Sequence, residues 1–264
     1  METIDVIIAC GVNSEKYCEF LIRSIEKTCS GKYFFNFLLG VNDRGVDFSS
    51  LEQIETKFDI SVYDCITEGV GSAGHGAALD LLFPYISSEF AMTCDVDTVA
   101  LAQNWDDIVI QKMLDSDASI IGAEYDGHKY MNFPNLMFCV FDTEVFRKCN
   151  VSFMPALKNI VIDENNAEIY SRAIGDVIFL DTGWQICYNL KTQGYSGICL
   201  PLKSPRHNDT CTFMTSDMRG EEYVLGDIPI FYHIGRSSSR SFDNPITIKW
   251  RNRTIEYLGL MDEN

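Results

Sequence analysis

Several features that define large protein classes are absent from this sequence. Its 264 residues contain no apolar run of about 18 residues, so no segment is predicted to span a membrane. Residues 1–5 show neither a basic stretch nor the start of a long apolar core, so no signal peptide is expected. No internal repeat, low-complexity stretch or linker is visible. We therefore expect a single domain covering residues 1–264.

Basic residues are also scarce. The chain has 21 lysines and arginines against 38 aspartates and glutamates, which gives a formal net charge of −17. Nucleic acids and anionic membranes both require a basic face, so the composition argues against a nucleic-acid partner. An acidic cleft would need a cation before a phosphate group could enter it.

The cysteines lack the spacing of a metal or redox motif. There are ten, but no Cys-x-x-Cys pair occurs among them. Several fall in apolar stretches that read as strands or helices: Cys10, Cys94, Cys139, Cys187 and Cys199. We expect buried free thiols in a reducing compartment, and hence a cytoplasmic protein.

The first hundred residues alternate between two hydrophobic patterns. Short apolar runs predict strands at 4–10, 34–41, 60–64 and 90–94. Helices are predicted from Ser14, as the cap, to about residue 29, over 51–58 on the spacing of its apolar residues, and over 77–82. This alternation predicts an α/β fold of the Rossmann-like kind, with a mixed but mostly parallel sheet flanked by helices.

The pattern loosens after about residue 115. Strands are predicted at 120–121, 136–141 and 196–200, and helices at 143–149 and 183–190. In an open parallel sheet, ligands bind at the carboxyl ends of the strands. That rule places residues 11–13, 42–43, 69–76 and 95–97 along one rim.

The segment 69–76 is rich in glycine, which allows a backbone to approach a ligand closely. It is no Walker A loop, because no Gly-Lys-Ser/Thr follows. It also follows the third predicted strand, whereas a dinucleotide fingerprint follows the first. The alternative to a ligand-binding loop is a plain turn.

The most specific motif is Asp95-Val96-Asp97, directly after the apolar run 90–94. Two carboxylates at positions i and i+2 past a strand end can converge on one hard cation, such as Mg²⁺ or Mn²⁺. Acidic pairs are also common in solvated turns. The position at the carboxyl end of a buried strand favours the metal site.

The order of these elements resembles a known family. A strand, a helix, a strand ending in Val41-Asn42-Asp43, a glycine-rich loop, a helix and an apolar strand with Asp-x-Asp are similar to the nucleotide-binding half of GT-A glycosyltransferases. The resemblance is greatest to the inverting family 2-type nucleotide-sugar transferases, typified by cellulose, hyaluronan and bacterial polysaccharide synthases. It implies a nucleotide-binding half at 1–100, and an acceptor-binding half with a C-terminal closing segment at 101–264.

The resemblance also implies roles for single residues. Asp95 would face the ribose or the metal, and Asp97 would bind the metal that bridges the diphosphate. Asp43 would read the edge of the nucleobase.

Further nucleotide-sugar contacts are implied beside these acids. The backbone at Cys10, Gly11 and Val12 would lie against the nucleoside. Gly74 and His75 fall where many family members carry Arg-Asn, so the sequence departs from the family pattern there.

Asp181 is the candidate catalytic base. It lies in a Leu-Asp-Thr-Gly-Trp segment that resembles the acidic, Trp-containing segment where the family places its base, although the usual second acid is missing. An inverting transfer needs one carboxylate to deprotonate the acceptor hydroxyl. The alternative is a helix N-cap, and Asp163 and Asp176 are weaker candidates.

His233 ends the apolar run 230–233 and is the candidate third metal ligand. Many GT-A enzymes use a late histidine in this way, and imidazole suits Mn²⁺ beside two carboxylates. A structural histidine is the alternative, and His207 is the competing ligand.

The C-terminal region 236–253 is locally basic, with Asp243 as its one acid. Arg236 and Arg240 flank three serines and suit a segment that closes over a diphosphate, while basic residues on a solvated helix are the alternative. Trp184 and Tyr125 are candidate acceptor-binding platforms, although such aromatic residues are more often part of a core.

These features predict a metal-dependent glycosyltransferase of polysaccharide biosynthesis. It would use a nucleoside-diphosphate sugar and a glycan or lipid-linked acceptor, with inversion. Two alternatives remain open: a sugar-1-phosphate nucleotidyltransferase and a non-catalytic nucleotide-sugar-binding domain. The first normally carries an Arg- or Lys-containing glycine-rich loop after the first strand, which residues 11–14 lack.

Overall fold

The computed structural model describes residues 1–69, 71–124, 133–157, 172–174, 177–204, 210–235 and 240–260. Of these, 156–157, 172–174 and 177–180 are described by their backbone alone. The candidate residues Tyr125 and Arg236 lie outside the described residues, as do His207, Asp163 and Asp176.

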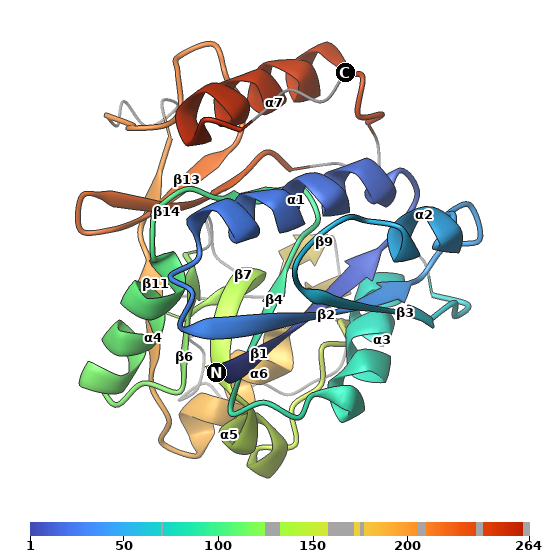
Figure 1. Cartoon of the computed structure of the whole chain (residues 1–264). Helices are drawn as coiled ribbons and strands as arrows, with labels where there is room; N and C mark the ends of the chain where they lie inside the picture. Colours follow the sequence, from blue (N-terminus) through green and yellow to red (C-terminus); the bar gives the residue numbers. More distant parts are fainter. Residues whose placement is uncertain are drawn as a thin grey trace.

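The order of elements is that of an α/β protein (Figure 1). The helices are α1 (Ser14–Thr28), α2 (Phe48–Glu52), α3 (Ser72–Leu82), α4 (Trp105–Asp115), α5 (Thr143–Lys148), α6 (Trp184–Thr192) and α7 (Pro245–Leu258), with a 3-10 turn η1 (Phe83–Tyr85). The strands are β1 (Glu2–Cys10), β2 (Tyr33–Val41), β3 (Asp59–Asp64), β4 (Phe90–Cys94), β5 (Thr98–Ala100), β6 (Ile120–Ala123), β7 (Asn135–Asp142), β8 (Ala156–Leu157), β9 (Arg172–Ile174), β10 (Val177–Leu180), β11 (Gly197–Leu200), β12 (Leu202–Lys203), β13 (Glu221–Leu225) and β14 (Ile228–His233).

The main sheet has seven strands in the order β11-β6-β7-β4-β1-β2-β3. Its strands run parallel except for β7, which pairs antiparallel with both β4 and β6. The carboxyl ends of β1, β2, β3 and β4 therefore meet at one edge. The predicted fold, a mixed and mostly parallel sheet flanked by helices, is confirmed.

Two layers of helices cover the sheet because side chains alternate along each strand. Ile4, Val6 and Ile8 of β1 belong to one apolar core, which also takes in buried residues of α1, α4 and α7. Ile7 and Ala9 belong to a second core on the opposite face, with residues of α3, α5 and α6. Figure 1 shows α7 lying over α1 on the outer side of the first layer.

A second sheet carries part of the functional site. It has the antiparallel order β12-β13-β14-β5, and β5 follows β4 after a short turn. The turn between β4 and β5 thus joins the two sheets. Strands β8, β10 and β9 form a further small antiparallel sheet.

Most predicted elements of the first hundred residues are present, with bounds within a few residues. The cap of α1 was wrong: the N-cap is Asn13, in a left-handed conformation with φ 65°, and Ser14 is the first helical residue. The Ser14 N–H donates to the carbonyl of Gly11 instead, at 3.1 Å, which closes the turn after β1.

The predicted helix over 51–58 was also wrong, because α2 ends at Glu52. The apolar spacing of residues 51–58 arises because Phe58 contacts the core from a loop that follows α2. The Phe58 ring packs at 5.2 to 5.9 Å against the rings of Phe34, Phe35 and Phe37 of β2. Side chains of an extended segment can therefore imitate a helical period.

Helix α3 begins at Ser72, several residues earlier than predicted, and so includes two glycines of the glycine-rich segment. Both are required by close packing. A Cβ on Gly74 would lie 2.7 Å from the carbonyl oxygen of Gly69, and one on Gly76 would lie 2.5 Å from that of Phe153. The glycines allow the helix to pass against these two backbones.

All ten cysteines are free, and seven of them are buried, including Cys10, Cys94, Cys139 and Cys187. Cys199 is half-buried. In the described part of the chain, no helix has the length and apolar character needed to cross a membrane.

Candidate active site

A cavity of about 620 Å³ opens at the carboxyl edge of the parallel strands. The segments that follow β1, β2 and β4 line it, together with the start of α3, the start of β7 and the segment before α6. Three acids are among its lining residues: Asp43, Asp95 and Asp181. The sequence had placed the first two of these on a common rim.

The turn between β4 and β5 fixes the two acids of the Asp-x-Asp motif. The Asp95 N–H donates to the carbonyl of Met137 at 3.0 Å, which continues the β4–β7 ladder. The N–H and the hydroxyl of Thr98 both donate to the Asp95 carbonyl, at 3.2 and 2.6 Å. Residues 95–98 therefore form a tight turn whose ends are held by two sheets.

His233 reaches this turn through strand pairing. Strand β14 pairs with β5 so that His233 lies opposite Thr98, and the N–H of Ile234 donates to the Asp97 carbonyl at 3.1 Å. The ladder places an imidazole beside a carboxylate that is 136 positions earlier in the chain. Because this register is set by backbone hydrogen bonds, the arrangement does not depend on the side chains finding each other.

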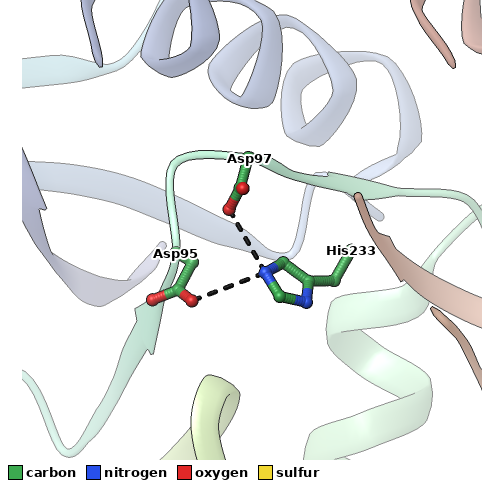
Figure 2. A group of neighbouring side chains, drawn as sticks. All are labelled: Asp95, Asp97 and His233. Carbon is green, nitrogen blue, oxygen red and sulfur yellow. Dashed lines mark ion pairs between the residues drawn. The ribbon is translucent and has the colours of Figure 1, made fainter. Parts of the chain in front are cut away.

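The three side chains converge on one point (Figure 2). His233 Nε2 lies 3.3 Å from Asp97 Oδ1 and 3.5 Å from Asp95 Oδ2. One ligand atom from each residue lies within 4.8 Å of the others. Asp97 and His233 are buried, with 2% and 9% of their surface exposed, whereas Asp95 is half-buried and faces the cavity.

The electrostatics around Asp95, Asp97 and His233 favour a bound cation. Burial by itself lowers the pKa of His233, but Asp97, Glu221 and Asp95 outweigh burial and raise it well above its ordinary value of 6.5. Burial raises the pKa of Asp95, and Asp97 and Asp181 add to that rise, against the opposing effect of His75 and His233. Negative charge is thus concentrated at a poorly solvated site.

The donor set fits a divalent metal. Two carboxylates and one imidazole suit Mn²⁺, and the carboxylates also suit Mg²⁺. Nε2 carries at most one hydrogen and so cannot donate fully to both Asp95 and Asp97. A cation bound by all three would satisfy them together.

The glycine-rich segment forms the opposite wall of the cavity. Gly71 has φ 57° and ψ −132°, a conformation open to glycine almost alone, and it caps α3. The first turn of α3 therefore begins in the cavity wall, with Gly71, Ser72 and Gly74 among the lining residues. Amides in the first turn of a helix have no intrahelical acceptor and favour anions.

His75 lies in this first turn and faces the metal group. Its Nε2 is 3.8 Å from Asp95 Oδ1, while the other oxygen of Asp95 faces His233. The carboxylate of Asp95 is thus flanked by two histidines. His75 lines the cavity, whereas His233 lies behind it.

The ends of β1 and β2 supply the far part of the cavity. Gly11 and Val12 line it, and Asp43 is exposed there, with Oδ1 accepting the N–H of Gly45 at 2.8 Å. Cys10 differs from its neighbours: its thiol is buried in the core, and its carbonyl accepts the N–H of Asn42 at 3.0 Å.

Asp181 arrives from the second half of the chain. It lies in a turn where the Trp184 N–H donates to the Asp181 carbonyl at 3.2 Å, and Asp181 Oδ1 accepts the N–H of Thr182 at 2.9 Å. The Thr182 hydroxyl donates to the carbonyl of Ser72 at 3.0 Å, which ties the turn to the start of α3. Asp181 is not the N-cap of α6, since Gly183 occupies that position with φ 78°.

Two other predicted residues lie apart from the cavity lining. Trp184 is 6% exposed and belongs to the core beneath α6, so its ring offers no platform for a sugar. Arg240 donates from Nη1 to the Gly235 carbonyl at 2.9 Å, two residues beyond His233. Within the described residues, the basic C-terminal region is largely the helix α7, which packs on α1 through Tyr17 and Trp250.

Sequence reasoning missed Glu221. This residue on β13 lies opposite His233 and places Oε2 3.4 Å from its Nδ1. Nothing in the local sequence distinguishes Glu221 from Glu222 beside it. Only the pairing of β13 with β14 identifies which of the two faces the histidine.

Comparison with known proteins supports the fold. No family model matches the chain, and no curated protein matches its sequence. Among solved structures, the mannosyltransferase PcManGT from Pyrobaculum calidifontis, in complex with GDP-Man and Mn²⁺, aligns with a TM-score of 0.52 at 11% identity. The alignment covers 75% of this chain and 54% of that one.

A second similar structure is that of S. aureus TarS 1-349 in complex with UDP-GlcNAc. It aligns with a TM-score of 0.43 at 16% identity, over 58% of this chain and 48% of the other. The chain thus spans about half the length of the proteins that it matches. The likeness to PcManGT, together with the strand order, defines a GT-A-type fold.

Proposed function

We propose that this chain is a metal-dependent glycosyltransferase that moves a sugar from a nucleoside-diphosphate sugar to a hydroxyl acceptor. One observation carries the proposal. Asp95, Asp97 and His233 converge at the edge of a cavity of about 620 Å³, at the carboxyl ends of parallel strands. The fold shared with PcManGT, whose structure holds GDP-Man and Mn²⁺, supports the same assignment.

The donor would occupy the wall built by residues 1–100, which we propose as the nucleotide-binding half. Gly11 and Val12, with the adjoining backbone of Cys10, would lie against the nucleoside, and the exposed carboxylate of Asp43 would read the base. The start of α3, with Gly74 and His75, would face the diphosphate because unpaired amides favour anions.

Asp95, Asp97 and His233 would hold Mn²⁺ or Mg²⁺ beside that diphosphate. When bound, the metal neutralises negative charge on the departing nucleoside diphosphate. Without it, the acidic cavity would repel the phosphates. Arg240 and Arg236 are proposed to approach the same charges from the C-terminal closing segment.

Asp181 is the proposed catalytic base. Three acids line the cavity. We assign Asp95 to the metal, Asp43 to the nucleobase and Asp181 to the acceptor, as the resemblance to the family 2-type transferases implies. Its carboxylate would take the proton of the acceptor hydroxyl as that oxygen attacks the anomeric carbon. As the new bond forms, the bond from the anomeric carbon to the diphosphate oxygen breaks, and the nucleoside diphosphate leaves with that electron pair. This single displacement inverts the configuration.

The acceptor would bind the half formed by residues 101–264. We propose a glycan or lipid-linked acceptor, as the resemblance to polysaccharide synthases implies, and a cytoplasmic location on the basis of the buried free thiols. The structure gives Trp184 a role in the core, so we leave it out of the acceptor site.

A donor screen tests this function. Purified protein would be incubated with Mn²⁺ or Mg²⁺ and a panel of UDP-, GDP- and dTDP-sugars, and release of nucleoside diphosphate would be followed. Asp97→Ala serves as the inactive variant. Slow metal-dependent hydrolysis of one donor, lost in the variant, is the expected result and would name the sugar.

Other outcomes would point to the alternatives. Pyrophosphate release from a nucleoside triphosphate and a sugar phosphate would indicate a nucleotidyltransferase. No turnover, together with no metal-dependent thermal stabilisation by any nucleotide, would overturn the assigned site and indicate a binding domain without metal.

A further inference from the structure

The two nitrogens of His233 have different partners. Nε2 faces Asp95 and Asp97, while Nδ1 lies 3.4 Å from Oε2 of Glu221. The imidazole is therefore held between the metal group on one side and a third carboxylate on the other. Glu221 plays no part in the cavity itself.

The pairing of Glu221 with His233 is built into the second sheet. The two residues lie directly opposite each other in the β13–β14 ladder. β14 in turn pairs with β5, where Thr98 lies opposite His233. One row of cross-strand neighbours thus runs from Glu221 through His233 to the end of the Asp-x-Asp turn.

The Glu221 carboxylate is itself fixed. Its Oε2 accepts the phenolic hydroxyl of Tyr223 at 2.8 Å. Tyr223 is fully buried and is two residues further along the strand, on the same face. A fixed carboxylate is what an orienting residue requires, because a mobile one could not select a ring orientation.

Glu222, which lies between Glu221 and Tyr223, has a different structural role. It is fully buried on the opposite face, and its carboxylate accepts the backbone N–H groups of Thr212, Phe213 and Met214 at 2.8 to 3.0 Å. Glu222 therefore anchors a loop. The chain supplies two adjacent glutamates on one strand, of which only one contacts the histidine.

We propose that Glu221 is a positioning residue that accepts a hydrogen bond from Nδ1–H of His233 and so directs the Nε2 lone pair to the metal. This inference rests on the proposed metal site. A neutral imidazole carries one hydrogen, and the partner of one nitrogen decides which nitrogen is free to bind a cation. Carboxylate partners of this kind orient metal-binding histidines and increase their basicity.

The affinity for Mn²⁺ is the first measurement. Mn²⁺ would be titrated into the full-length chain, alone and with UDP or GDP present, and free Mn²⁺ would be followed by EPR. Removal of an outer carboxylate costs about 10 to 100-fold in metal affinity, so we expect a loss of that size in Glu221→Ala. Glu221→Gln should recover most of it, because the amide oxygen can still accept from Nδ1–H.

Glu222→Gln is the matched control. It removes the same charge from the neighbouring position of the same strand, so we expect a lower melting temperature and an unchanged Mn²⁺ affinity. A loss of affinity in Glu222→Gln as large as that in Glu221→Ala would overturn the inference, since both variants would then act through the stability of β13.

The tautomer provides a second test that needs no Glu221 variant. The full-length chain would be labelled with ¹⁵N-histidine, saturated with Mg²⁺ and measured by NMR. The signal of His233 would be assigned by its loss in His233→Gln. We expect His233 to carry its proton on Nδ1. A proton on Nε2 would overturn the inference. If the wild-type chain binds neither Mn²⁺ nor Mg²⁺, the proposed metal site fails; if it binds and Glu221→Ala binds equally well, only this inference fails.

Discussion

The two halves of the chain build one cavity in different ways. In the first hundred residues, parallel strands end at a common edge, so the neighbouring strands β4, β1 and β2 place Asp95, Gly11 and Asp43 beside one another at the cavity. The later residues arrive by long-range contacts. His233 is placed by antiparallel pairing with β5, and Asp181 by a turn that is bonded to α3.

This difference separates what each half can contribute. The first half forms a continuous wall whose shape depends on backbone, glycines and strand ends. The second adds single side chains at defined points, and one of them, His233, crosses to complete a site that the first half begins. If the halves have the proposed roles, substitutions in each should change different measured quantities.

The largest effect is expected where the halves meet. Asp97→Ala removes a buried carboxylate ligand, and metal stabilisation of a leaving group is worth several kcal/mol. We expect loss of Mn²⁺ binding and a fall in kcat/KM of about 1000-fold. The measurement is nucleoside diphosphate release across a Mn²⁺ series.

Asp227→Ala is the control for charge alone, because Asp227 is fully exposed and lies 3.9 Å from Lys203, away from the cavity lining. It should retain wild-type turnover. Metal-independent turnover that survives in Asp97→Ala would contradict the proposed metal site, which Asp95 and Asp97 of the first half form together with His233 of the second.

Asp181→Asn tests the contribution of the second half alone. A general base contributes about 100-fold or more, so we expect kcat to fall by about that factor. Mn²⁺ affinity and donor binding should stay close to wild type, because in the proposed mechanism Asp181 contacts the acceptor and is not a metal ligand. Donor binding can be measured by calorimetry with the donor alone. A loss of donor affinity equal to the loss of kcat would remove the distinction between the halves.

The contrast also explains how far the sequence predicted the fold. The strands β1, β2 and β4 contain buried apolar runs, and β4 was predicted with its observed bounds because both of its faces are buried. The helix boundaries were less accurate. Phe58 imitates a helical period from a loop, and the glycines in α3 look like a loop although backbone packing requires them inside a helix.

The site follows the same division. The order of strands is enough to place Asp43 and Asp95 on one edge, since parallel strands end together. The position of Glu221 follows from a register between β13 and β14 that no local pattern encodes. Trp184 was ambiguous for another reason: a tryptophan on an amphipathic helix fits a core or a sugar platform equally well, and only its burial decides.

Gly76→Ala tests the contact that joins the halves. Alanine normally stabilises a helix by about 1 kcal/mol relative to glycine, but here a Cβ would lie 2.5 Å from the Phe153 carbonyl oxygen. That oxygen also accepts the N–H of Gly183, next to the Asp181 turn. We expect a net loss of about 2 kcal/mol in the free energy of unfolding, together with a lower kcat.

Chemical denaturation measures this change, and Leu81→Ala is the control on the same helix. Leu81 is 47% exposed, so its truncation should change the free energy of unfolding by no more than about 0.5 kcal/mol. A more stable Gly76→Ala variant with unchanged kcat would show that α3 and the second half are not tightly coupled.

The smallest effect is a pH dependence of the metal site. Asp97, Glu221 and Asp95 outweigh burial and raise the pKa of His233 in the metal-free fold. A raised pKa means that protonated His233 stabilises this fold fully below pH 6.5, and that the contribution is lost as the pH rises through the raised value. Mn²⁺ must displace the same proton, so its affinity should rise with pH, by up to about tenfold per unit below that value.

Mn²⁺ titrations and thermal melts at pH 6, 7 and 8 measure both sides of this linkage. The metal-free melting temperature should fall as the pH rises, while the stabilisation by Mn²⁺ should grow. In His233→Asn the titrating ligand is absent, so the slope of affinity against pH should flatten. A Mn²⁺ affinity that is constant between pH 6 and 8 in the wild-type chain would show that His233 binds no metal. Asp95 and Asp97 would then form the metal site alone, without a contribution from the second half.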